Sequence, residues 1–251
     1  MKFKKWVAGI VLLVLAVSAY GQQYDPESDF IVEIIEGNLL VITGYRGSKQ
    51  AIRIPPRIQG LPVLAVGDYA FMEKNLTSVV IPDTVIIIGM AAFAFNNLTS
   101  IIIPNSVTGI NDAAFAVNRL TSITIPGSVK TIGDFAFTQN RLTNIIISNG
   151  VVTIGDDAFG SGFDLDDPAT FRSNILNISS IVIPDSVTHI GWRAFFAMDY
   201  SISIDRITIG ANVQVENGAF GARGFETFYR EQGRRAGTYT YSNNRWTVQF
   251  R

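Results

Sequence analysis

The sequence contains no cysteine and only one histidine among 251 residues. Without cysteine the chain can form no disulfide, and it offers no thiolate to a metal or a substrate. A single histidine leaves few candidates for a base that works near neutral pH. Charged residues, at 16%, are too few for a disordered charged tail, whereas 47% hydrophobic residues can build a core. The sequence therefore predicts a fold held by packing alone, without a cofactor.

Other missing features argue against nucleic-acid binding and against the common enzyme classes. The formal net charge of -1 provides no basic stripe for phosphates, so nucleic acid is not an expected partner. No G-x-S-x-G elbow, phosphate loop or H-E-x-x-H motif is present. His189 occupies a slot that other copies of the repeat described below fill with unrelated residues, which indicates a surface side chain. We therefore do not expect an enzyme; a hydrolase or metal-dependent enzyme would need a catalytic cluster that the sequence does not show.

The first 21 residues are typical of a secretory signal. Lys2, Lys4 and Lys5 precede an apolar stretch over residues 7–17, and small residues near Ala19 offer a cleavage site. The alternative is an uncleaved anchor, but the stretch is shorter than the roughly 20 residues that span a bilayer. We expect an exported protein, located in the periplasm, on the cell surface or outside the cell, without stable membrane insertion after cleavage.

A repeat of 22 residues dominates the rest of the chain. Three successive units align directly: Leu76–Asn97, Leu98–Arg119 and Leu120–Arg141. Looser copies begin at Ile52, Leu142, Ile178 and Ile204, which makes about seven. This period, with Leu-x-x-Ile-x-Ile spacing, is that of a leucine-rich repeat with one short strand per turn and a return path. The predicted fold is a mainly-β curved solenoid with a parallel sheet on its concave face.

The repeat also predicts which side chains form the core. Strand alternation points Leu76, Val79 and Ile81 inward, and Pro82 fits the end of the strand because it has no N–H to donate. A second inward pair follows, as in Val85 and Ile88. Then comes an Ala-Phe pair, whose rings should stack as a column inside the coil: Phe71, Phe93, Phe115, Phe137, Phe159, Phe195 and Phe220.

Non-repeating segments should close the two ends of the coil. We assign residues 22–50 to an N-terminal cap made of a strand pair, with its turn at residues 36–38. Residues 51–225 form the repeats, with an insertion at about 160–177. Residues 226–251 form a C-terminal cap: a short helix to about Gly233, then a hairpin that turns at residues 242–244.

The pattern IPxSVxxIGxxAFxxNxLTSIxIP resembles the BspA-like leucine-rich repeat family of secreted and surface proteins. The resemblance covers about residues 38–225, and the terminal GRRAGTYTYSNNRWT is similar to the closing segment of many bacterial members. It implies a curved parallel solenoid and, in some members, adhesion to macromolecules of a host or a neighbouring cell. It implies no single ligand.

Two columns of outward side chains form the candidate binding site. The first, which we call the outward ladder, would run roughly 25 Å across the strands: Val80, Ile102, Thr124, Ile146, Val182 and Thr208. Beside it lies a polar column: Ser78, Ser100, Ser122, Asn144, Ser180 and Arg206. An exposed aliphatic strip is typical of an interaction surface. The alternative is that these β-branched residues only stabilise the sheet.

The insertion GSGFDLDDPATFRSNILN is a second candidate, because loops that interrupt a solenoid often carry recognition. Phe163 and Phe171 are its contact candidates. Asp164, Asp166 and Asp167 would suit calcium by their oxygen chemistry, but the segment lacks the glycine and glutamate of an EF-hand loop, and a solvated acidic loop explains them as well. We therefore predict no metal site.

These features together predict an exported binding module whose partner is a protein or a glycan, with cell-surface adhesion as one form of that role. The alternative is a structural or spacer protein of the periplasm or cell envelope.

Overall fold

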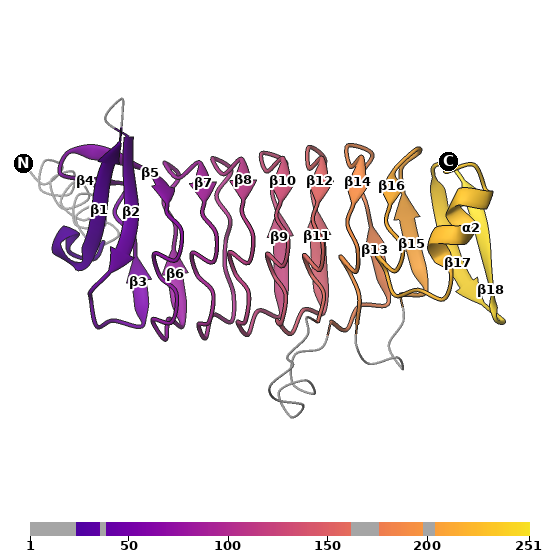
Figure 1. Cartoon of the computed structure of the whole chain (residues 1–251), viewed down its shortest axis with the longest axis horizontal. Coiled ribbons are helices and arrows are strands. Elements are labelled where there is room, and N and C mark those ends of the chain that lie inside the picture. Colours follow the sequence, from indigo (N-terminus) through magenta and orange to yellow (C-terminus); the bar gives the residue numbers. More distant parts are fainter. Residues whose placement is uncertain (1–23, 36–38, 162–175, 198–203) are drawn as a thin grey trace, which may run out of the picture.

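The computed structural model describes residues 24–35, 39–161, 176–197 and 204–251. The chain coils into a row of turns that lie side by side, with an antiparallel strand pair at each end (Figure 1). The predicted fold is confirmed: it is a mainly-β solenoid of about 7 turns with parallel strands and almost no helix. The signal segment, the 36–38 turn and the insertion with Phe163, Phe171 and Asp164–Asp167 lie outside the described residues.

Each full turn has two sites for a strand, where we expected one strand and a return path. The first row contains the strands that the repeat spacing predicts: β3 (Ala51–Arg53), β6 (Ser78–Val80), β9 (Ser122–Ile125), β11 (Asn144–Ile147), β13 (Ser180–Val182) and β15 (Arg206–Ile209). The second row uses the return segment: β5 (Leu61–Val66), β7 (Ile87–Ile88), β8 (Gly109–Ile110), β10 (Thr131–Ile132), β12 (Thr153–Ile154), β14 (His189–Ile190) and β16 (Gln214–Val215).

The two rows differ in continuity. Second-row strands pair in parallel from β5 to β16 in one ten-stranded sheet. First-row strands pair only in patches, β3 with β6, β9 with β11, and β13 with β15. Proline separates the rows: the carbonyl of Pro82 accepts the N–H of Val85 at 3.1 Å, and Pro104 and Pro126 repeat this turn. The proline thus ends the strand and its carbonyl closes the turn into the return segment.

The Ala-Phe corner forms a third side of the coil. The N–H of Phe93 donates to the carbonyl of Ala114 in the next turn at 2.8 Å, and Phe115 and Ala136 repeat the bond. The predicted column is confirmed, because successive rings from Phe71 to Phe220 stack with centroids 5.0 to 5.3 Å apart. The corner holds non-glycine residues such as Ala91 and Ala113 at positive φ, which costs about 1–2 kcal/mol each. Burial of a whole ring in every turn offsets that cost.

A ladder of buried asparagines, which the sequence analysis did not predict, ties successive turns together. It consists of Asn96, Asn118 and Asn140, each 22 residues from the next. The Asn118 Nδ2 donates to the carbonyl of Phe93 at 2.9 Å, and its Oδ1 accepts the N–H of Leu98 at 3.0 Å. One side chain therefore satisfies backbone groups of the preceding turn that no strand ladder reaches.

Aromatic rings cover both ends of the phenylalanine column. At the N-terminal end, a 3-10 turn (Glu27–Asp29) leads into β1 (Phe30–Ile35), which pairs antiparallel with β2 (Leu39–Tyr45). The ring centroids of Tyr45 and Phe71 lie 5.6 Å apart. β2 joins β5 in parallel, and β4 (Arg57–Ile58) pairs with β5 in an antiparallel sense.

At the C-terminal end, α2 (Phe225–Glu231) places the edge of the Phe225 ring on Phe220 at 5.2 Å. β17 (Gly237–Ser242) then pairs antiparallel with β15 and with β18 (Arg245–Phe250). This hairpin covers the last strand of the first row. Within the described part of the chain, no helix has the length and apolar character needed to cross a membrane.

Candidate interaction surface

The outward ladder lies on the first row, where strand pairing sets its register. Thr124 pairs with Ile146, and Val182 pairs with Thr208, so these side chains are direct neighbours across the strands. Ile102, Val182 and Ile146 are 84%, 62% and 49% exposed. Thr124 is also exposed, whereas Val80 and Thr208 are half-buried. The structure thus places the six residues on one face, with the most accessible ones in its middle.

The ladder ends at the C-terminal cap. The Thr208 hydroxyl lies 3.0 Å from the Thr238 hydroxyl of β17, which pairs with β15. Thr208 therefore contacts the cap more than it offers a free surface. The sequence could not show this end, because β17 belongs to no repeat.

The polar column lies beside the ladder as predicted. Ser78, Ser100, Ser122 and Asn144 are all exposed, and so are Ser180 and Arg206. A further exposed column, which the sequence analysis did not single out, consists of Thr77, Thr99, Thr121 and Thr143. The Thr143 hydroxyl donates to the carbonyl of Thr121 at 3.2 Å. These threonines therefore support the coil while they widen the polar border of the ladder.

The charge on this face is low. Between Arg53 at one end and Arg206 at the other, the ladder and polar column contain no ionisable side chain. Removing water from aliphatic side chains is favourable, and no carboxylate or ammonium group must lose its hydration along the strip. The face is therefore suited to apolar contact with a partner.

The second row offers a less continuous surface. Its exposed aliphatic side chains are Ile86, Ile87 and Val152. The same columns contain polar residues in the neighbouring turns, including Lys130 and Thr131. His189 lies in this row on β14, half-buried, beside Thr153 and Gln214. This histidine has no arrangement around it that indicates catalysis.

The corner side carries exposed aromatic residues that sequence reasoning missed. Tyr69, Phe95, Phe135 and Trp192 are each between 43% and 53% exposed. Tyr69 and Phe135 occupy the slot that Ala91 and Ala113 fill in other turns. A large ring at an alanine slot is the signal that could have revealed them.

One buried ion pair lies at this corner. Asp157 and Arg193 are 1% and 4% exposed, with Oδ1 and Nε 3.5 Å apart. Burial raises the pKa of Asp157 to about 6, Arg193 opposes the rise, and Asp156 adds to it. The Arg193 guanidinium also lies over the rings of Trp192 and Phe196, at 4.8 and 4.5 Å. Such enclosure makes the pair part of the packing, because no substrate reaches it.

No cluster of three or more histidine, cysteine, aspartate or glutamate side chains suited to a metal occurs among the residues that the structure describes. The exposed aspartates of the corner have a structural use instead. The Oδ1 of Asp112 accepts the N–H of Asp134 at 2.9 Å, and Asp134 does the same for Asp156 at 2.8 Å. Each carboxylate therefore caps the next turn.

Comparisons with solved structures show the same fold. A T. pallidum leucine-rich repeat protein matches with a TM-score of 0.50 and 23% identity, over 69% of this chain and 88% of that one. A leucine-rich cell surface protein from Faecalibacterium prausnitzii matches with a TM-score of 0.50 and 21% identity, over 92% and 62%. The pneumococcal vaccine antigen PcpA matches with a TM-score of 0.53 and 19% identity, over 78% and 51%.

Comparisons of the sequence identify the family. A comparison with curated proteins gave no match. The profile of the BspA type Leucine rich repeat region matches residues 65–175 and 167–245, in 6 copies. The match covers more than half of the chain and the same turns that stack in the structure. The chain therefore belongs to the BspA-type leucine-rich repeat family.

Proposed function

We propose that this protein is a binding module that engages a protein partner through the outward ladder. The observation that carries the proposal is the exposure of Ile102, Ile146 and Val182 on one uncharged face. A partner that covers them removes aliphatic surface from water at about 25 cal/mol per Å². Side chains held on stacked turns also lose little conformational freedom on binding.

The scaffold alternative does not explain the most exposed residue. β-branched side chains are common in strands because they pack well on a pleated surface. Ile102, however, lies in a stretch, residues 101–103, that forms no strand, and it is 84% exposed. Sheet stabilisation therefore gives no reason for an isoleucine there, whereas contact with a partner does.

We further propose that the protein is exported, and that it works at the cell surface, outside the cell or in the periplasm. The basic and apolar residues at the start of the sequence support export. A glycan partner and cell-surface adhesion remain part of this proposal. Protease treatment of intact cells tests the location: cleavage of the protein in intact cells supports surface exposure, and protection until the envelope is opened supports the periplasm.

A pair of matched double variants tests the ladder. Ile102→Asp with Ile146→Asp places two charges on the ladder, two turns apart. Ile87→Asp with Thr131→Asp places two charges at exposed second-row positions, also two turns apart. Immobilised chains from Gln22 to Arg251 are used to capture surface proteins from the native cells, and thermal melting checks that each variant is folded. We expect the first variant to lose the captured protein and the second to retain it; full capture by a folded first variant would exclude the ladder as the site.

A further inference from the structure

The C-terminal cap concentrates positive charge in a chain that is otherwise acidic. Residues 222–251, which are the cap and the four residues before it, contain six arginines and two glutamates, a formal charge of +4, so the other 221 residues together carry -5. One of those glutamates, Glu226, is buried, and its carboxylate accepts the N–H of Phe220. The exposed charge of the cap is therefore dominated by arginine.

Three of the six arginines form an ion pair or lie over an aromatic ring. Arg251 pairs with Asp185 at 2.8 Å. Arg235 lies 3.7 Å over the ring of Phe250, and Arg223 lies 5.0 Å over that of Tyr241. Arg230 and Arg234 differ from these three, because both line a cavity.

The cavity lies where the repeats meet the cap. It has a volume of about 480 Å³, and its lining comes from β16, the residues after it, α2 and the turn after α2: Gln214, Val215, Glu216, Asn217, Arg230 and Arg234. This volume is within the range of small-molecule sites.

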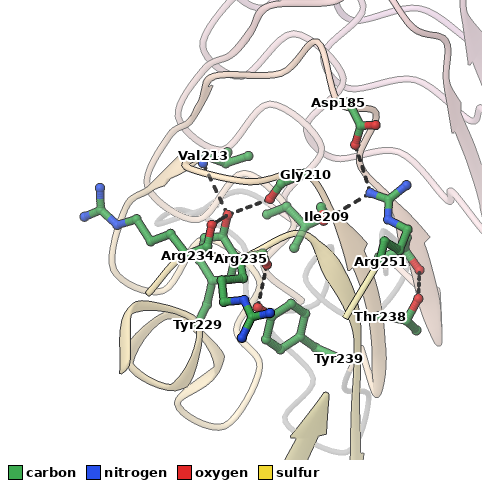
Figure 2. Close-up of polar contacts among 11 residues, drawn as sticks. Asp185, Ile209, Gly210, Val213, Tyr229, Arg234, Arg235, Thr238, Tyr239 and Arg251 are labelled. Atoms are coloured by element: carbon green, nitrogen blue, oxygen red, sulfur yellow. Dashed lines mark hydrogen bonds and ion pairs between the residues drawn. The ribbon is translucent and has the colours of Figure 1, made fainter. Parts of the chain in front are cut away.

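Backbone bonds fix the position from which Arg234 extends. Its carbonyl accepts the N–H of Asn212 at 2.7 Å, and its N–H donates to the carbonyl of Tyr229 at 3.0 Å. The Tyr229 hydroxyl in turn donates to the carbonyl of Gly210 at 2.7 Å (Figure 2). The Arg234 side chain extends away from this network in Figure 2. The network therefore fixes the start of the side chain and leaves its guanidinium available to a ligand.

Three of the other lining residues carry hydrogen-bonding groups. The Arg230 Nη2 lies 3.5 Å from the Asn217 Oδ1. The Gln214 Nε2 donates to the Glu216 Oε1 at 3.0 Å. The cavity thus combines two guanidinium groups, two amides and one carboxylate, beside the apolar Val215.

We propose that this cavity binds a carboxylate-bearing sugar. Guanidinium groups bind carboxylates with two parallel hydrogen bonds. The amides of Gln214 and Asn217 and the carboxylate of Glu216 suit the hydroxyl groups of a sugar ring. Glu216 would repel a compact dianion such as phosphate, which favours a singly charged ligand that also carries hydroxyl groups. This site is separate from the outward ladder and adds a second ligand class to the protein.

Calorimetric titration of the full mature chain in about 0.15 M salt tests the proposal, with glucuronate, glucose, acetate and inorganic phosphate as probes. We expect glucuronate to bind with a millimolar dissociation constant, and the other three to bind at least about tenfold more weakly. Arg230→Gln with Arg234→Gln should weaken glucuronate binding at least about tenfold. Arg245 is an exposed arginine that begins β18 outside the cavity, so Arg245→Gln should leave glucuronate binding unchanged.

Three results of the titrations would overturn the proposed sugar site. Equal binding of acetate or phosphate would overturn the sugar class, and equal binding by the double glutamine variant would overturn the site. No heat of binding with glucuronate at about 10 mM would overturn both. The Ile102→Asp, Ile146→Asp variant should bind glucuronate like the wild type, so failure of this site and failure of the ladder can be told apart.

Discussion

Asn118→Ala removes one rung of the buried asparagine ladder in the middle of the solenoid. The Asn118 side chain donates to the carbonyls of Phe93, Phe115 and Ala116 and accepts the N–H of Leu98. It is 3% exposed, so water does not replace these bonds without opening the coil.

The loss of stability in Asn118→Ala depends on which partners of Asn118 are left without a hydrogen bond. Each of the three carbonyls keeps a second donor, such as the Asn96 Nδ2 for the carbonyl of Phe93, whereas the N–H of Leu98 is left without its bond to Asn118. A buried polar group left without its bond costs about 1–3 kcal/mol. The Leu98 N–H therefore gives an expected loss of about 2 kcal/mol in the free energy of unfolding, a substantial share of the stability of an ordinary domain.

Urea denaturation followed by circular dichroism measures that loss. Asn97→Ala is the matched control, because Asn97 directly follows Asn96, another member of the asparagine ladder, but is only half-buried, and its expected loss is below about 1 kcal/mol. Equal losses for the two variants, or a loss below about 1 kcal/mol for Asn118→Ala, would refute the structural role of the asparagine ladder.

Two further predictions concern the core and the buried ion pair. Phe115→Ala, which removes a ring stacked 5.3 and 5.2 Å from its two neighbours, should cost about 3–5 kcal/mol in the same assay; a loss below about 1 kcal/mol would contradict the column as a main source of stability. Burial raises the pKa of Asp157 to about 6 in the folded state, so the folded chain binds this proton more tightly than the unfolded chain does. The Asp157 contribution should therefore favour folding as the pH falls from about 7 to 4.5, by at most about 3 kcal/mol. Asp157→Asn should remove that pH dependence, and an unchanged dependence in the variant would contradict the assignment.

The repeat made much of the fold predictable from the sequence. Phe115 and its equivalents recur every 22 residues from Phe71 to Phe159, and the same Ala-Phe pair marks Phe195 and Phe220, so their stacking follows from the repeat alone. The outward direction of Ser122 and Thr124 follows from strand alternation around the inward Ile123. The second strand row was not predictable, because a two-residue strand such as Thr131–Ile132 is too short to show alternation.

Other features depend on contacts that periodicity does not encode. Asn118 lies in a segment with the composition of a turn, and only its burial shows that it bonds across turns. Asp157 and Arg193 are 36 residues apart on either side of the insertion, so their pairing has no local signal. The end of the ladder at Thr208 depends on β17, which joins the sheet from outside the repeat.

The most direct test of the proposed function is site-specific photocrosslinking on the native cells. A photoreactive phenylalanine derivative replaces Ile102 on the ladder or, in a second chain, the exposed Thr131 of the second row. We expect a defined crosslinked protein from position 102 and none from position 131. Equal crosslinking from both positions, or a crosslinked protein only from position 131, would contradict the claim that the outward ladder is the binding surface.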